Sequence, residues 1–153
     1  MSDTVRLYVG KDIEIAYDPE RCIHAAECTR GLPAVFDSSR RPWIQTDGAS
    51  ANAIAAVVVR CPSGALHFIR RDGGDPETRP DHDSVTLMPG GPLYVRGLLR
   101  LHGADGSVIV EDTRLALCRC GQSQNKPFCD NSHLGVAFDD AGKAPDAEAK
   151  ATR

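Results

Sequence analysis

Hydrophobic and polar positions alternate at the start of the chain, in the segment TVRLYVGKDIEIAYDP. Apolar side chains recur at every second position on both sides of Gly10–Asp12, which is the pattern of two strands joined by a turn. In SANAIAAVVVR, the capping residue Ser50 precedes apolar residues at helical spacing, Ile54, Val57 and Val58. RPWIQTDG and SGALHFIR predict further strands before and after this helix. The first half therefore predicts two strands, a cysteine-containing loop, a strand, a helix and a strand.

The second half has a β pattern throughout. Leu93 and Val95 alternate with Tyr94 and Arg96, and LLRLHGADGSVIV places a glycine-containing turn between two apolar runs. A further run, Leu115–Leu117, leads directly into a cysteine-rich stretch. This half therefore predicts a β-rich domain whose last strand ends at a candidate site.

A polar segment separates the two halves. RRDGGDPETRPDHDS, residues 70–84, is rich in Gly, Pro and Asp and almost free of apolar residues. We therefore predict an α+β chain of two small domains, residues 1–70 and 85–138, joined by a linker at 71–84. The end of the chain, residues 139–153, is small and polar and is predicted to be disordered.

Charge and hydropathy exclude several classes of function. The net charge of −3 is evenly spread and lacks the basic stripe that nucleic-acid binding requires. The longest apolar run, Ala53–Val59, is far shorter than the ~20 residues that cross a bilayer, and MSDTVRLYVG does not have the pattern of a signal peptide. We expect a cytoplasmic protein without membrane or nucleic-acid partners. In that compartment its six cysteines are metal ligands or redox groups rather than disulfides.

The stretch CRCGQSQNKPFCDNSH contains four side chains that can bind a metal, namely Cys118, Cys120, Cys129 and His133. On an extended segment the first two face the same way, because one residue separates them. The i, i+4 spacing of Cys129 and His133 places both on one face of a helix start. Three cysteines and a histidine would suit zinc, although a Cys-x-Cys pair is tighter than the spacing usual for that metal.

The same stretch resembles the CDGSH iron–sulfur family (NEET proteins), with the pattern Cys-x-Cys-x2-Ser/Thr-x3-Pro-x-Cys-Asp-Gly-Ser/Ala/Thr-His. The resemblance covers about residues 85–138, and its single departure is Asn131 in place of glycine. Asparagine is the next best residue for left-handed backbone, so the change is mild. The resemblance implies a 2Fe–2S cluster with Cys118 and Cys120 on one iron and Cys129 and His133 on the other.

A second resemblance covers residues 5–70. CIHAAEC, RGLPAVFD, RPWI and CPSGAL are similar to the divergent single-cluster ferredoxin domain, whose usual pattern is Cys-x2-Cys-x2-Cys and a remote Cys-Pro. Here Ala25 stands at the position of the central cysteine. The remaining Cys22, Cys28 and Cys61 imply a 3Fe–4S cluster, or a 4Fe–4S cluster with another fourth ligand, for which His24 is the candidate. The alternative is a degenerate domain whose cysteines are buried as small hydrophobic residues.

These sites predict one-electron transfer rather than an enzyme, since we recognise no nucleotide-binding loop, nucleophile elbow or paired carboxylates. A histidine ligand raises the reduction potential of a cluster, and it introduces pH sensitivity because a free imidazole titrates near ~6.5. Asp130 and Ser123 are candidates for hydrogen bonding around the ligands. The alternatives are an iron–sulfur cluster donor or redox/pH sensor, and a zinc-binding structural module. The expected partners are a redox protein or an apo-acceptor, and the expected oligomer is a homodimer.

Overall fold

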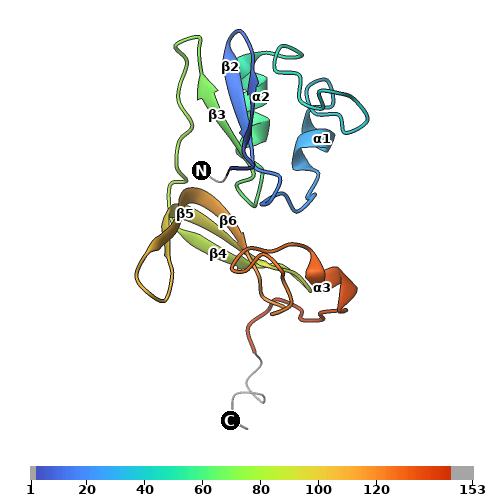
Figure 1. Ribbon diagram of the computed structural model, residues 1–153, viewed down its shortest axis with the longest axis vertical. Coiled ribbons are helices and arrows are strands. Elements are labelled where there is room, and N and C mark those ends of the chain that lie inside the picture. The colour runs from blue at the N-terminus through green and yellow to red at the C-terminus, as the bar shows by residue number, and fades with distance from the viewer. Residues whose placement is uncertain (1–2, 146–153) are drawn as a thin grey trace.

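Two antiparallel three-stranded sheets make up the computed structural model, which describes residues 3–145 (Figure 1). The first sheet has the order β1 (Arg6–Val9), β2 (Ile13–Tyr17), β3 (Leu66–Arg70), and the second has the order β4 (Ser84–Leu87), β5 (Leu93–His102), β6 (Val108–Leu117). The helices are α1 (Glu27–Gly31), α2 (Ala51–Val58) and α3 (Ser132–Gly135). This arrangement is consistent with the two small domains that the sequence predicts.

The hairpin predicted at the start of the chain is confirmed as β1 and β2. Its register pairs Tyr8 with Ile15 and Val9 with Glu14. As a result, Tyr8 and Ile15 point toward the core, whereas Leu7 and Val9 are exposed on the other face of the sheet. Side chains of β1 therefore do alternate between the two faces of the sheet, but the aliphatic ones face away from the core.

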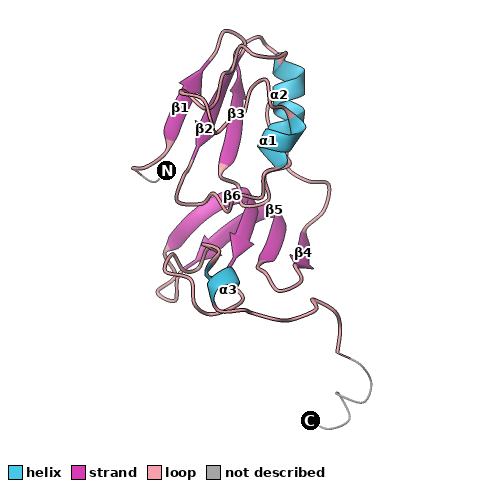
Figure 2. Ribbon diagram, turned by 90° about the vertical axis from the view of Figure 1, so that its right-hand side faces the viewer, coloured by secondary structure: helices cyan, strands magenta, loops and turns pink. Residues whose placement is uncertain are grey.

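Helix α2 supplies one side of the core of the first domain. The Ser50 hydroxyl accepts a hydrogen bond from the Ala53 amide at 3.2 Å, which confirms the predicted cap. Ile54, Val57 and Val58 are all buried, as their helical spacing predicts. Both α1 and α2 lie on one side of the first sheet (Figure 2), so this small domain buries a single sheet face under two short helices.

The predicted strand in RPWIQTDG is reduced to one isolated bridge, between Phe36 and Ile44. Ile44 is buried, and the Trp43 ring meets the Tyr17 ring edge-on with centroids 4.9 Å apart. The segment is thus apolar because it packs into the core as a loop rather than because it extends a sheet.

In the second domain, β5 and β6 form the predicted hairpin. The Gly103 amide donates a hydrogen bond of 2.8 Å to the Ser107 carbonyl, and Gly106 adopts the left-handed backbone that the turn requires. Beyond α3, Asp140 accepts a hydrogen bond from the Arg119 side chain at 2.7 Å. Asp140 belongs to segment 139–153, which is predicted to be disordered. Residues 146–153 of that segment lie outside the described residues.

No helix within residues 3–145 combines the length and apolar character needed to cross a membrane.

Candidate metal centres

The four candidate ligands of the second domain come together as two close pairs. The sulfur atoms of Cys118 and Cys120 are 3.8 Å apart, and the Cys129 sulfur is 3.6 Å from Nδ1 of His133. Two details differ from the sequence prediction, because β6 ends at Leu117 and α3 begins only at Ser132. The first pair therefore stands on a bend after the strand, and only His133 of the second pair is helical.

Backbone contacts hold this loop against the end of β6. The Cys129 amide donates to the Ala116 carbonyl and the Cys118 amide to the Pro127 carbonyl, both at 2.9 Å. Burial alone would raise the pKa of Cys118, but hydrogen bonds from the backbone of Ser123 and its neighbours lower it. The pKa of Cys129 is raised, chiefly by burial. Amide hydrogens directed at sulfur are the usual environment of a thiolate that binds metal.

Asp130 and Ser123 organise the loop from within. The Asp130 carboxylate accepts hydrogen bonds from the Ser132 amide at 3.0 Å and the Gln124 amide at 2.8 Å. Hydrogen bonds with Ser132 and Gln124 hold the pKa of Asp130 at about 2. The buried Ser123 hydroxyl donates to the Phe128 carbonyl at 2.7 Å. Both residues thus act on the backbone between the candidate ligands, and their role toward a metal stays a prediction.

The three cysteines of the first domain surround one cavity of about 490 Å³, together with His24 and Ala25. Cys28 lies on α1, a short helix that the sequence analysis treated as a loop. Burial, and then the neighbouring Cys61 and Cys22 side chains, raise the pKa of the Cys28 thiol to about 11. The three cysteines therefore lie around one space that is open to a larger group.

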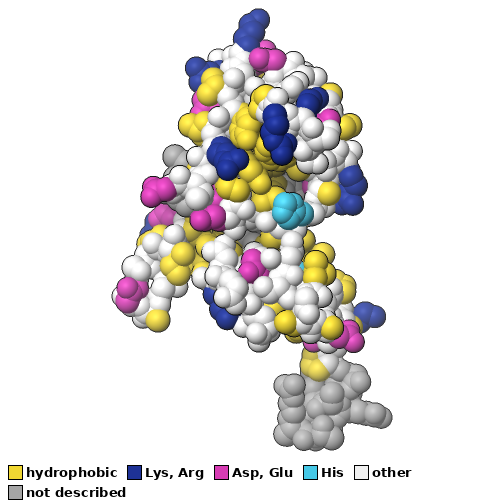
Figure 3. Space-filling model, turned by 45° about the vertical axis from the view of Figure 1, so that its right-hand side comes forward, with side chains coloured by type: hydrophobic (Ala, Val, Ile, Leu, Met, Phe, Trp, Pro, Cys, Tyr) yellow, Lys and Arg dark blue, Asp and Glu magenta, His cyan; other side chains and the backbone are white. Residues whose placement is uncertain are grey.

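Arginines and aromatic side chains complete the lining of this cavity, notably Arg6, Tyr8, Tyr17, Arg41 and Trp43. On the face drawn in Figure 3, Lys and Arg side chains surround hydrophobic side chains of the first domain.

The loop between Cys22 and Cys28 has an unusual backbone. His24 and Ala26 both have positive φ, 55° and 63°, which L-residues adopt at a cost of roughly 1–3 kcal/mol each. Such conformations cluster at functional sites. His24 is exposed at the cavity, while Ala25 packs against the other domain. The assignment of His24 as a fourth ligand stays a prediction.

Neither group of cysteines is arranged for a single ion. Within residues 3–145, no three His, Cys, Asp or Glu side chains converge closely enough to hold one metal ion. A structural zinc would require four ligands about one centre. Ligands that bind the separate iron atoms of a cluster stand farther apart.

The two candidate centres meet at the domain junction. Ile23, next to Cys22, is buried in one cluster with Ala116 and Cys129 of the second domain. The Asn131 side chain donates a hydrogen bond of 2.9 Å to the Ile23 carbonyl. The Asn125 side chain makes a similar bond of 2.8 Å to the Glu20 carbonyl. In the sequence Asn131 is recognisable only as a substitute for glycine, so this contact was not predicted.

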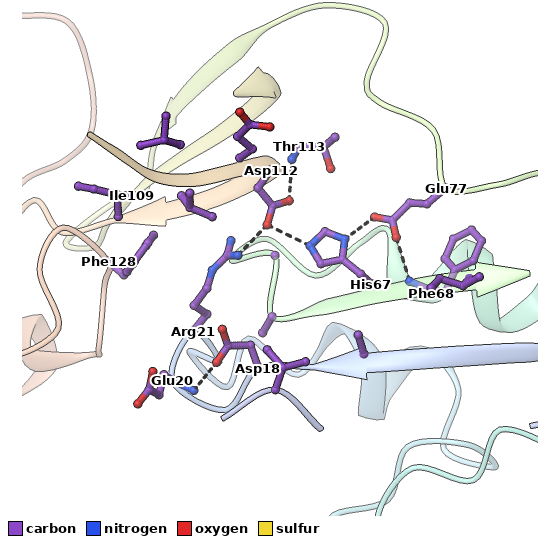
Figure 4. Close-up of a pocket in the computed structure, with 18 of the residues that line it drawn as sticks. Asp18, Glu20, Arg21, His67, Phe68, Glu77, Ile109, Asp112, Thr113 and Phe128 are labelled. Atoms are coloured by element: carbon purple, nitrogen blue, oxygen red, sulfur yellow. Dashed lines mark hydrogen bonds and ion pairs between the residues drawn. The ribbon is translucent and has the colours of Figure 1, made fainter. Parts of the chain in front are cut away.

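A buried ionic network forms the other part of the junction. The Arg114 guanidinium, 2% exposed, contacts Glu77 at 2.6 Å and donates to the carbonyls of Val58, Cys61 and Leu66 at 2.7–2.9 Å. His67 lies between two carboxylates, with its ring nitrogens 2.8 Å from Glu77 and 3.0 Å from Asp112 (Figure 4). The segment predicted as a linker therefore contributes Glu77 to the packing of the domains.

Charge balance in this network follows from its hydrogen bonds. Burial alone would lower the pKa of His67, but Asp112 and Glu77 outweigh it and raise the pKa to about 9. Burial alone would raise the pKa of Asp112, but His67 and Arg21 lower it to about 2. No pattern in the sequence marks these residues, because single charges in polar segments and strands are usually exposed.

A groove of about 920 Å³ runs along this junction, between the outer face of the first sheet and β6. Its lining mixes aliphatic residues such as Ile69 and Ile109 with the carboxylates of Glu14 and Glu111. Both carboxylates are already paired, with Arg71 and Arg100.

Two family models match this chain one after the other, and both describe iron-binding domains. Residues 8–71 match the family described as a divergent 4Fe-4S mono-cluster, and residues 90–134 match the iron-binding zinc finger of CDGSH type. The chain belongs to the divergent 4Fe-4S mono-cluster family and carries a CDGSH domain after it.

Two curated relatives match the first domain alone. Both are the uncharacterized protein YjdI of Escherichia coli, from strain K12 and from O157:H7. Each is 35% identical over 63 residues, which cover 41% of this chain and 83% of the relative. The match to these relatives does not include the second domain of this chain.

Proposed function

We propose that this chain is an iron–sulfur protein that transfers single electrons. The observation that carries the proposal is the pairing of four ligand side chains at 3.8 Å and 3.6 Å in the CDGSH motif. A 2Fe–2S cluster needs one pair of ligands for each iron. Cys118 and Cys120 would hold one iron, and Cys129 and His133 the other.

The first domain fits a larger cluster. In this proposal it is a ferredoxin-like unit of an α+β chain, in which Cys22, Cys28 and Cys61 hold a 3Fe–4S or 4Fe–4S cluster. The cavity of about 490 Å³ beside these cysteines supports that assignment. His24 lines the same cavity and is the candidate for a fourth ligand to iron.

When bound, such clusters supply reversible one-electron chemistry without covalent change to a substrate. The residues of this chain hold the ligands, direct amide hydrogens at the sulfur atoms and exclude water from the buried side of Cys129. A 2Fe–2S cluster with a protein ligand at every position binds no substrate, and we propose no enzyme activity for this chain. All six cysteines are free, which supports a reducing compartment such as the cytoplasm.

A second candidate function is cluster donation or redox and pH sensing. It is favoured by the position of His133 on α3, a helix with no buried residue, where Leu134 is 73% exposed. A partner could reach the histidine side of the cluster there. The expected partners are a redox protein for electron transfer or an apo-acceptor for donation, and a homodimer is the expected assembly.

Metal analysis of anaerobically purified protein tests the proposal. Iron with acid-labile sulfide is expected. Cys118→Ser should lower the iron content by about two per chain, the content of a 2Fe–2S cluster. Cys28→Ser should instead remove the iron of the first domain. Zinc without sulfide would contradict the proposal and leave a structural module. Transfer of the cluster to an apo-acceptor, with loss of the donor spectrum, would favour the second candidate.

A further inference from the structure

We propose that Ile23 and Asn131 connect the two cysteine centres into one electron-transfer unit, in which electrons pass from the first domain to the CDGSH domain. The inference rests on the proposed function, because it assumes that both centres hold clusters. It adds a path between them and assigns a role to the asparagine that replaces the motif glycine.

The first connection runs through Ile23. This residue is bonded to Cys22 through one peptide unit, and its side chain is 8% exposed. It packs in the same buried cluster as Cys129. From one candidate ligand to the other, the path is therefore covalent except for the packing within this cluster of Ile23, Ala116 and Cys129. Electron tunnelling is faster through bonded and closely packed atoms than through water or gaps.

The second connection runs through Asn131. Its side-chain amide donates to the Ile23 carbonyl at 2.9 Å, and its own backbone amide donates to the Cys129 sulfur at 3.4 Å. One residue thus contacts a candidate ligand of the second centre and the backbone beside a ligand of the first. Its φ of 69° would suit glycine equally well, but glycine has no side chain to reach Ile23.

An aromatic side chain of the second domain adjoins the same buried cluster. Tyr94, on β5, packs against the cluster of Ile23 and Cys129. Burial, and then the Cys129 and Cys61 side chains, raise the pKa of Tyr94. Arg114 donates to the Cys61 carbonyl at 2.8 Å and holds that ligand loop against β6.

The transfer moves one electron and no atom. An external low-potential reductant, such as a flavin or iron–sulfur protein, is oxidised as it reduces the cluster of the first domain. The internal step oxidises that cluster again and reduces the cluster with the histidine ligand. The direction is proposed for a first cluster held by thiolates alone, because replacing one thiolate by imidazole raises the reduction potential of the second cluster.

The test uses the full chain, loaded anaerobically, with iron and sulfide measured before each experiment. Flash photoreduction with a deazaflavin delivers one electron, and visible absorbance follows its redistribution between the clusters. Asn131→Gly keeps the left-handed backbone and removes only the side-chain bond to Ile23. Ile23→Ala removes most of the side chain that packs in the cluster with Ala116 and Cys129. The matched control is Asn125→Ala, which removes a similar interdomain bond to the Glu20 carbonyl, a bond that contacts no candidate ligand.

We expect the internal transfer to be severalfold slower in Asn131→Gly and in Ile23→Ala, and unchanged in Asn125→Ala. Ile23→Leu, which retains side-chain volume, should retain the rate. Electron paramagnetic resonance of the fully reduced protein should show magnetic interaction between the clusters in every variant, because the interaction depends on distance rather than on the path.

Two outcomes overturn the inference while the proposed function stands. They are unchanged transfer rates in both variants with both clusters present, and wild-type clusters without magnetic interaction. A chain that binds zinc without sulfide, or a single cluster only, overturns the inference through its premise and is recognised from the metal analysis.

Discussion

The guanidinium of Arg114, in the second domain, donates a hydrogen bond of 2.8 Å to the carbonyl oxygen of Cys61, in the first. The two residues are 53 positions apart in the sequence. A strand of one domain thereby supports the backbone of a candidate cluster ligand in the other. The stability of the junction and the environment of the first centre should consequently change together.

Arg114→Met should lower the free energy of unfolding by about 3–5 kcal/mol. It removes one of the two cationic partners of the largely buried Glu77 and the donor to three backbone carbonyls. Chemical denaturation measures the change. Arg100→Met is the matched control, since Arg100 also pairs with a glutamate, Glu111, but both side chains are about 60% exposed. That substitution should cost about 0–1 kcal/mol. Equal losses in the two variants would contradict a structural role of the buried network.

The domain junction should weaken as pH rises. His67 has a pKa of about 9 in the folded chain, above its usual 6.5. Its protonation therefore stabilises the fold fully below 6.5 and ceases to do so as pH rises through 9. Asp112 behaves in the opposite sense, because its lowered pKa stabilises the fold above 3.8 and that contribution is lost as pH falls through about 2.

Denaturation of the wild type and of His67→Gln across this range measures the effect. The free energy difference between them should shrink from about pH 6.5 to about pH 9. A difference independent of pH would show that the His67 ring stays neutral between Glu77 and Asp112.

Gly64 should tolerate substitution poorly, because it lies at the junction with a left-handed backbone (φ +71°). A methyl group there would overlap the Arg114 carbonyl oxygen and the Arg21 side chain. Gly73 has a similar φ of +79° with open space around it. We expect Gly73→Ala to cost about 1–2 kcal/mol from backbone strain alone, and Gly64→Ala to cost clearly more. Similar losses at both positions would mean that the domains pack less closely than described.

The histidine ligand should make the second cluster sensitive to acid. Protonation of the imidazole competes with the iron–nitrogen bond, so the visible spectrum should fade as pH falls. In His133→Cys the cluster should resist acid better, and its reduction potential should be lower and less dependent on pH. His102→Gln, at an exposed position in the β5–β6 hairpin, is the control and should behave like the wild type. Unchanged pH-dependence in His133→Cys would refute the role of this ligand.

Local patterns predicted most of the individual elements. The alternation around Gly10–Asp12 produced the first hairpin, and the cap at Ser50 marked the start of α2. Both depend on residues that are near one another in sequence. RPWIQTDG failed as a strand because Trp43 and Ile44 are apolar for a different reason, namely packing against Tyr17 and the core.

The candidate ligands were predictable because cysteine spacing is itself a local property. The pairings of Cys118 with Cys120 and of Cys129 with His133 follow from separations of two and four residues. The first centre was predictable only in part. The closeness of Cys61 to Cys28 depends on how α1 and α2 pack.

The sequence by itself determined the two iron-binding motifs, the short elements that present them and the polar segment between the domains, since each depends on neighbouring residues. Only the tertiary structure decided that the two centres share one junction. Asn131 and Ile23 are 108 residues apart, and Arg21 meets the Arg114 carbonyl across 93. Such contacts arise when separate surfaces bury apolar area and satisfy each other's polar groups, which no local pattern along the chain records.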